Sequence, residues 1–259
     1  MYHLPFPSPD SDVDADQALL ALERLFEVEI SSEDVACIIV EPVQGEGGFR
    51  RLCPQFAQRL QSICKDLGIL LIIDEIQSGF GRTGRRFAFS QLNIEPDLLL
   101  IGKSIAAGLP LAAVVGRPEL MNALTKGGLG GTYSGNALAC AAASQVMKLM
   151  TEDQLRTWGI QQEEMILDFH AALKATHLYP MLGPLTGIGC MRGIVFESTP
   201  DVTGAEHLAK LLVFAREEGV LLMPSGRHKN ILRLLPPLTT EAEILQEGLA
   251  CIERALRKL

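Results

Sequence analysis

The sequence has little of what would indicate several large classes of protein. Its six cysteines are scattered without a CxxC pair, and its five histidines lie far apart without an HExxH motif. The cysteine and histidine spacing therefore indicates neither a zinc site nor a disulfide framework, and we expect reduced thiols in a cytoplasmic protein. No apolar run approaches the roughly 20 residues of a membrane-spanning helix.

Positive charge is also scarce. The chain has 31 acidic and 23 basic residues, which gives a formal net charge of −8. Because nucleic acids are bound mainly through basic surfaces, we do not expect a nucleic-acid partner. The first nine residues are polar and rich in proline, without the basic leader and apolar run of a signal peptide.

What the sequence does have is material for a core and a regular alternation of helices and strands. Of its 259 residues, 47% are hydrophobic, which is enough for one large or two ordinary domains. The alternation before residue 150 predicts an α/β domain with a mainly parallel sheet. The predicted helices cover 15–27, 54–67 and 136–150, and the predicted strands cover 35–40, 69–74, 97–101 and 111–115.

The pattern changes after residue 150, and we predict a smaller α+β domain over 151–259. A helix around Leu155 to Phe169 leads to a strand over 190–196, and another helix is expected over 205–218. Short strands are expected over 220–223 and 231–235. Thr240 and Glu243 predict a capping box at the start of the last helix.

Two charged residues, Asp74 and Lys103, each close an apolar strand. Such short apolar runs are typical of strands buried in a parallel sheet, where ligands bind at the carboxyl ends. An anion and an amine at that edge suit a pyridinium cofactor, because one pairs with the ring nitrogen and the other forms the Schiff base. Taken without Lys103, Asp74 is also explained as a helix cap or turn residue. A desolvated Lys103 would be the better nucleophile.

Two glycine-containing segments resemble nucleotide-binding motifs. Gly79–Gly84 matches GxGxxG, but residues 75–78 separate it from the strand and residues 85–89 do not read as a helix. Gly102–Ser104 resembles the end of a phosphate-binding loop, yet the earlier glycine position holds Asp97. Neither segment therefore indicates a nucleotide site.

Two further segments have both a structural and a functional explanation. Gly130–Gly135 precedes a predicted helix and is either an anion cradle or an ordinary loop with a helix cap. Arg233 lies inside an apolar strand, where it requires a carboxylate partner or a bound ligand. The sequence alone leaves both pairs of alternatives open.

Five segments of the sequence form a recognisable set: Ile39–Gly48, Ile73–Gly84, Gly102–Ser104, Gly130–Asn136 and Leu232–Leu234. Together they closely resemble the class III (omega) aminotransferases, which are fold-type I enzymes that use pyridoxal 5'-phosphate. The resemblance is nearest to 4-aminobutyrate aminotransferases. It implies an incomplete, mainly parallel large-domain sheet over 1–150 and a C-terminal α+β small domain.

The resemblance also implies roles in holding the cofactor. Lys103 would be the Schiff-base lysine and proton shuttle, and Asp74 would keep the pyridine nitrogen protonated. Ile76 would pack on the ring, and Gln77 would hydrogen-bond near its phenolic oxygen. Thr132 would reach the cofactor phosphate of a neighbouring subunit, which implies a homodimer with shared active sites.

The resemblance implies substrate-binding residues as well. Arg233 would bind the α-carboxylate of glutamate or 2-oxoglutarate. Glu46 would pair with Arg233 when the amino donor lacks that carboxylate, and Glu41 would line the same pocket. The substrates would be an amino donor such as 4-aminobutyrate and a 2-oxo acid acceptor, with an aldehyde and glutamate as products.

The resemblance begins partway into the family. Family members carry an N-terminal portion with a Gly-Ser/Thr loop for the cofactor phosphate, and we expect the isolated chain to bind the cofactor weakly. A non-catalytic remnant that keeps the dimer interface is the alternative to an enzyme. Among enzymes, acetylornithine, ornithine, diamine and β-alanine aminotransferases are the other members considered.

Overall fold

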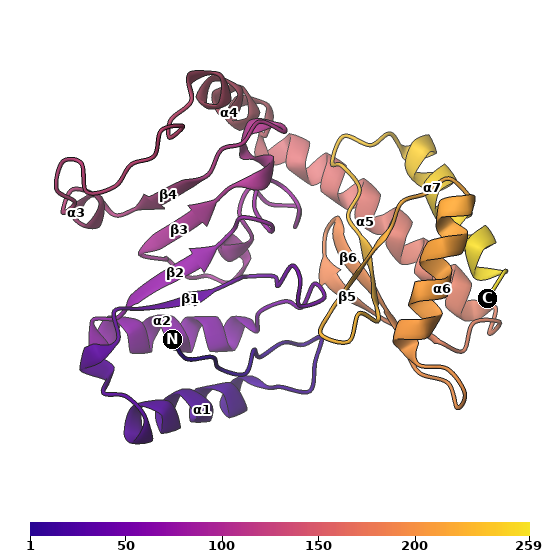
Figure 1. Cartoon of the computed structure of the whole chain (residues 1–259), viewed down its shortest axis with the longest axis horizontal. Helices are drawn as coiled ribbons and strands as arrows, with labels where there is room; N and C mark the ends of the chain where they lie inside the picture. Colours follow the sequence, from indigo (N-terminus) through magenta and orange to yellow (C-terminus); the bar gives the residue numbers. More distant parts are fainter. The chain divides into compact units, whose positions relative to one another are not determined.

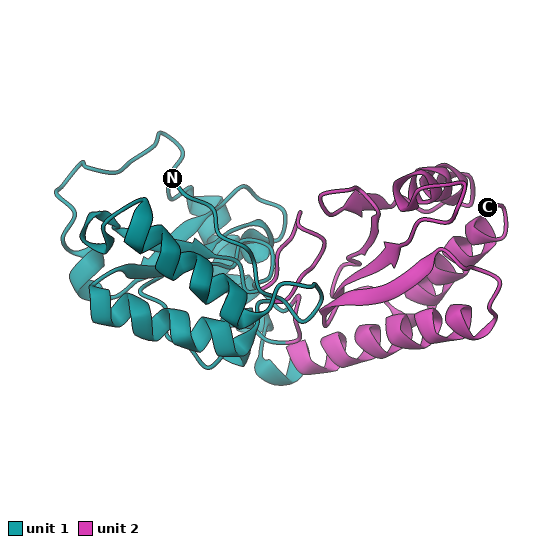
Figure 2. Ribbon diagram, turned by 90° about the horizontal axis from the view of Figure 1, so that it is seen from below, with its two compact units in different colours: residues 1–42, 52–81, 85–154 teal, residues 43–51, 82–84, 155–259 magenta.

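A computed structural model describes all residues 1–259, which form two compact units (Figure 2). Unit 1 comprises Met1–Pro42, Leu52–Gly81 and Arg85–Gln154. Unit 2 comprises Val43–Arg51, Arg82–Gly84 and Leu155–Leu259. Two short segments from the first half of the sequence thus belong to unit 2. The division of the protein into domains 1–150 and 151–259 stays a prediction.

Unit 1 contains a four-stranded sheet in the order β1-β2-β3-β4 (Figure 1). The first three strands are parallel and the fourth is antiparallel to β3, so the predicted, mainly parallel α/β sheet is confirmed. Apolar residues on both faces of β2 and β3 are typical of strands in such a sheet. The strands are β1 (Cys37–Val40), β2 (Leu70–Asp74), β3 (Leu98–Ile101) and β4 (Ala113–Gly116).

The helices of unit 1 begin and end close to the predicted positions. Helix α2 (Pro54–Leu67) starts with Pro54 in its first turn and ends at Gly68, whose φ of 69° is left-handed. The apolar faces of α1 (Ala15–Val28) and α2 form one buried cluster with β2 and β3. The remaining elements are α3 (Pro118–Met121), α4 (Ala137–Leu149) and the 3-10 turns η1 (Ser32–Asp34), η2 (Ala88–Gln91) and η3 (Lys103–Ala106).

Unit 2 contains a second sheet, in which all neighbouring strands are antiparallel, in the order β5-β6-β8-β7. Three helices contribute to its buried cluster, which includes Ile166, Leu208 and Leu249. The strands are β5 (Leu182–Ile188), β6 (Met191–Phe196), β7 (Met223–Ser225) and β8 (Ile231–Leu234), and the helices are α5 (Glu152–Ala175), α6 (Gly204–Glu217) and α7 (Ala242–Leu256).

The structure differs from the sequence predictions at three places in unit 2. The short strand expected over 220–223 lies at Met223–Ser225 instead. Strand β5 was not predicted, because Gly183, Pro184 and Gly187 favour a loop, and its pairing with β6 is irregular between Leu182 and Leu185. The capping box is also absent, because α7 starts at Ala242 with Glu241 as its cap residue, without a side-chain hydrogen bond. No helix in the structure combines the length and apolarity needed to cross a membrane.

Candidate active site

Three predicted site residues lie at one edge of the sheet in unit 1. The strand register pairs Val40 with Ile73 and Asp74 with Leu100. Glu41 therefore follows β1 beside Asp74, and Lys103 comes three positions after Leu100 on the other side. Because neighbouring strands are about 4.8 Å apart, this edge gathers two carboxylates and an amine from three consecutive parallel strands.

The turn after β2 lies close to the end of β3. The Ile76 amide donates to the Asp74 carboxylate (Oδ1, 2.9 Å), and the Glu75 amide donates to the Leu100 carbonyl (2.9 Å). Ile76 lies against Gly102, where an added Cβ would come within 3.4 Å of the Ile76 side chain. The turn that carries Asp74 is thus held next to the residue that precedes Lys103.

Lys103 begins η3 with a positive φ of 45°, an uncommon backbone conformation for a residue other than glycine. Such strain is often found at functional sites, where the surrounding structure holds it in place. The residue is exposed. The expectation of a desolvated lysine is therefore not met in this structure.

Gln77 offers a polar atom suited to a ligand. It is half-buried, and its Oε1 atom is buried without a hydrogen-bond partner. Buried acceptors without a partner are costly, and those found in native structures call for an explanation. Together with Asp74 and Ile76, this acceptor fits the pyridine ring that the sequence pattern implies.

Glu75 is a residue of this turn that sequence reasoning did not single out. It is fully buried, and its carboxylate accepts hydrogen bonds from the Ser78 hydroxyl and the Phe89 amide (2.7 Å). Burial raises the pKa of Glu75 to about 7, and the nearby Asp74 adds to the shift. The sequence did contain a signal for Glu75, because it is a second charged residue directly after the apolar strand that ends at Asp74.

Thr132 lies in an exposed loop of unit 1. The helix that follows is capped by its own Asn136, whose Oδ1 accepts from the amides of Leu138 and Ala139 at 3.1 Å. This helix start is therefore an ordinary cap in this structure. The phosphate-binding role of Thr132 stays a prediction.

The remaining two predicted residues meet in unit 2. Arg233 in β8 forms an ion pair with Glu46, with 2.8 Å between Nη2 and Oε2. The Arg233 guanidinium also lies over the ring of Phe49, 5.5 Å from its centroid. The Nε atom of Arg233 is buried without a hydrogen-bond partner. The arginine thus has the carboxylate partner that its position in an apolar strand requires.

The segment Val43–Arg51, which carries Glu46, is fixed through its backbone. The Gly226 amide donates to the Glu46 carbonyl (2.9 Å), and the Thr186 hydroxyl donates to the Gly48 carbonyl (2.8 Å). The Glu46 side chain itself is 81% exposed. Its carboxylate can therefore change partners while the loop stays in place.

The GxGxxG segment forms a turn instead of a helix start. The amides of Phe80 and Gly81 donate to the carbonyls of Arg86 and Arg85, at 2.7 and 3.1 Å. A dinucleotide site requires helix amides directed at a pyrophosphate. The conclusion from the sequence, that this is no nucleotide site, agrees with the structure.

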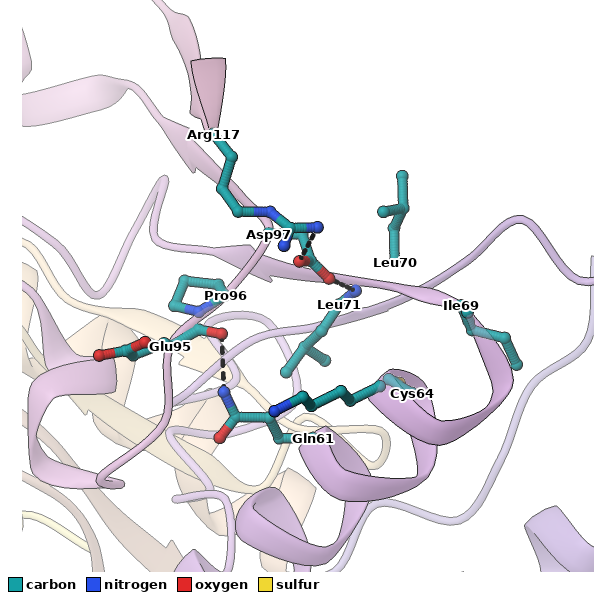
Figure 3. A pocket seen from close by; sticks show the side chains of 11 residues that line it. Gln61, Cys64, Ile69, Leu70, Leu71, Glu95, Pro96, Asp97 and Arg117 are labelled. Atoms are coloured by element: carbon teal, nitrogen blue, oxygen red, sulfur yellow. Dashed lines mark hydrogen bonds and ion pairs between the residues drawn. The ribbon is translucent and has the colours of Figure 1, made fainter. Parts of the chain in front are cut away.

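One cavity of about 430 Å³ opens at the amino end of β2 and β3 (Figure 3). Asp97 lies in its wall, where its carboxylate accepts from the Leu71 amide and pairs with Arg117, both at 2.7 Å. Leu70 and Leu71 start β2, so the cavity is at the opposite end of the strand from Asp74. None of the predicted site residues lines it.

Comparison with known proteins agrees with this arrangement. The sequence profile described as "Aminotransferase class-III" matches residues 1–256. The chain is 58% identical to a 2-aminoadipate transaminase of Pseudomonas putida and 41% identical to a 4-aminobutyrate aminotransferase of Escherichia coli. These matches cover 100% and 98% of this chain, but only 62% and 60% of the relatives' own lengths.

Solved structures show the same fold. An ornithine aminotransferase of Toxoplasma gondii has a TM-score of 0.78 at 31% identity and covers 93% of this chain and 54% of its own. An amine transaminase from an uncultivated Pseudomonas species, solved with pyridoxal phosphate bound, has a TM-score of 0.81 at 28% identity and covers 94% and 56%.

The fold and the solved relatives define an α/β protein of the pyridoxal-phosphate-dependent transferase type. The chain belongs to the class III aminotransferase family. The family and its solved relatives indicate pyridoxal phosphate as the cofactor. The chain spans about three-fifths of the length of the curated relatives it matches.

Proposed function

We propose that this chain supplies the cofactor-anchoring and carboxylate-binding residues of an aminotransferase that passes an amino group to 2-oxoglutarate. One observation carries the proposal: Asp74 and Lys103 follow neighbouring parallel strands at the same edge of the sheet. When bound, pyridoxal phosphate supplies an electron sink for the carbon next to the substrate nitrogen.

The residues of unit 1 hold and orient the ring in this proposal. The Asp74 carboxylate keeps a proton on the ring nitrogen, and the Lys103 amine is the nucleophile and later moves a proton at the substrate carbon. Ile76 packs on the ring, and Gln77 hydrogen-bonds near the phenolic oxygen. Thr132 binds the phosphate of the cofactor in a neighbouring subunit, which makes the active unit a homodimer.

The Arg233–Glu46 pair determines which donors are accepted. Arg233 binds the α-carboxylate of glutamate or 2-oxoglutarate through two parallel hydrogen bonds. A donor without an α-carboxylate, such as 4-aminobutyrate, leaves Arg233 paired with Glu46, and Glu41 lines the same pocket. The observed ion pair supports this proposal, because it shows that the Glu46 carboxylate can reach the Arg233 guanidinium.

A second donor is 2-aminoadipate, favoured by the 58% identity to a 2-aminoadipate transaminase against 41% for the 4-aminobutyrate enzyme. This donor has an α-carboxylate, so it would displace Glu46 from Arg233. Glu46→Gln separates the two donors. Turnover of 4-aminobutyrate should fall by about tenfold or more, because the half-buried Arg233 loses its charged partner, whereas turnover of 2-aminoadipate should change little.

Trapping of the cofactor linkage tests the central assignment without requiring turnover. The full chain is incubated with pyridoxal phosphate and reduced with borohydride, and the labelled lysine is identified by peptide mass spectrometry. We expect the label at Lys103 and its loss in Lys103→Ala, with exposed Lys126 as the internal control. Equal labelling of Lys126 and Lys103 would contradict the proposal and favour a non-catalytic remnant.

A further inference from the structure

Arg233 is held by two partners that differ in exposure. Glu46 is 81% exposed, whereas the ring of Phe49 is fully buried beneath the guanidinium. The ion pair of an exposed carboxylate is weak, because solvent screens it, so another anion can readily replace that carboxylate. A buried aromatic ring keeps its cation–π contact, because the ring has no alternative position.

Phe49 is fixed more firmly than its place in a loop suggests. It has a positive φ of 58° and packs in a small cluster with Val43 and Met191. Gly187 faces it closely, since an added Cβ there would come within 3.2 Å of the Phe49 Cβ. The loop backbone next to Phe49 is held by the Thr186 hydroxyl, which donates to the Gly48 carbonyl.

Arg233 itself needs such a support. Its side chain is only 15% exposed, and its Nε atom has no hydrogen-bond partner. When a substrate carboxylate displaces Glu46, the ion pair that orients the guanidinium is lost. The contact with the Phe49 ring does not depend on Glu46, and it leaves the edge of the guanidinium available for hydrogen bonds.

We propose that Phe49 is a positioning residue that keeps the Arg233 guanidinium oriented while carboxylates exchange at its edge. The inference rests on the proposed carboxylate-binding role of Arg233. It makes Phe49 a determinant of affinity for substrates with an α-carboxylate. Phe49 acts through Arg233 and does not contact the reacting atoms.

The test follows the Arg233 side chain directly, by ¹⁵N NMR of the Nε–H group in the full chain. The signal is assigned by its loss in Arg233→Lys. We expect slow exchange of this proton with water in the wild type. Glu46→Gln should retain the slow exchange, because Phe49 remains, whereas Phe49→Leu should accelerate it by about tenfold or more. Loss of protection in Glu46→Gln alone would overturn the proposal, whether or not Phe49→Leu folds.

Phe196→Leu is the matched control, because Phe196 is an equally buried phenylalanine in the main cluster of unit 2. It should lower the melting temperature without accelerating exchange at Arg233. Equal acceleration in both leucine variants would reduce Phe49 to a general packing residue and would overturn the proposal.

Titration with glutarate, a dicarboxylate probe, separates this inference from the proposed function. We expect glutarate to shift the Arg233 signal in Glu46→Gln, and the apparent Kd to rise about fivefold or more when Phe49→Leu is added. If glutarate never shifts a well-protected Arg233 signal, the carboxylate-binding role fails. The positioning of the guanidinium by Phe49 would then still stand on the exchange data.

Discussion

At the scale of single residues, Glu75 carries a prediction about pH. Burial raises its pKa from 4.5 to about 7, and the negative charge of the neighbouring Asp74 adds a smaller upward contribution. The folded protein therefore binds this proton more tightly than the unfolded chain. The stabilising contribution of protonated Glu75 is complete below pH 4.5 and is lost as the pH rises to about 7.

Glu75→Gln should remove this dependence, because a neutral amide mimics the protonated acid. Relative to the wild type, we expect the variant to gain up to about 3 kcal/mol of unfolding free energy between pH 5 and pH 8, at about 1.36 kcal/mol per pKa unit. Urea unfolding at a series of pH values measures the difference. Exposed Glu95→Gln is the control, and parallel curves for wild type and Glu75→Gln would contradict the prediction.

The sequence predicted several of these residues because they obey simple rules. Asp74 and Lys103 were found as charges that end apolar strands, and Arg233 as a charge inside one. The exposure of Lys103 was not predictable, because it depends on what covers the strand end. The contact between Phe49 and Arg233 was equally hidden, since these residues are far apart in the sequence.

At the scale of elements, the segment after β8 depends on donors from elsewhere in unit 2. Pro236 and Pro237 have no amide hydrogen, so this segment cannot continue a regular strand pairing. The Arg82 guanidinium donates to the Pro236 carbonyl, and Gln162 donates to the carbonyls of Pro237 and Leu238 at 2.8 and 3.0 Å. These bonds fix the chain directly after the strand that carries Arg233.

Arg82→Met should therefore destabilise unit 2 by about 1–3 kcal/mol, the usual cost of a buried polar group that loses its partner. Arg85→Met is the matched control, because Arg85 is an exposed arginine of the same loop, 4.0 Å from Glu152 at the surface. The control should change stability by less than about 0.5 kcal/mol. Similar losses in the two variants, measured by urea unfolding, would show that Arg82 is not a specific support.

Elements were predicted well where terminal residues mark them. Pro54 and Gly68 delimit α2, and its predicted range 54–67 is the observed one. Strand β5 was missed because Gly183 and Gly187 weaken the alternating pattern, and only pairing with β6 makes the segment a strand. Local sequence rules do not include such partners.

At the scale of the whole molecule, the sequence predicted an α/β part followed by an α+β part. It did not predict that Val43–Arg51 and Arg82–Gly84 would join the second unit. Nothing in the local pattern of these segments specifies that assignment. It follows from long-range bonds, such as the Cys190 amide donating to the Arg82 carbonyl at 3.0 Å.

The sheet of unit 1 is covered unequally, and this leads to the last prediction. Ile73 faces the buried cluster with α1 and α2, whereas the strand register places Ile39, Ile72, Leu100 and Val114 on the other face. Ile39 is 56% exposed and Val114 is 49% exposed. Parallel strands are normally covered on both faces. Because these apolar side chains are exposed, this face of the sheet is open to apolar ligands and to association.

The double variant Ile39→Thr with Val114→Thr should reduce binding of an apolar fluorescent dye to the isolated chain by about half or more. Its stability should change little, because neither side chain is in the buried cluster and threonine keeps the branched shape favoured in strands. Ile73→Thr, on the covered face, should instead cost about 2–4 kcal/mol, because it places a hydroxyl in a packed core. Unchanged dye binding in the double variant would show that the dye binds elsewhere and that this face is closed in solution.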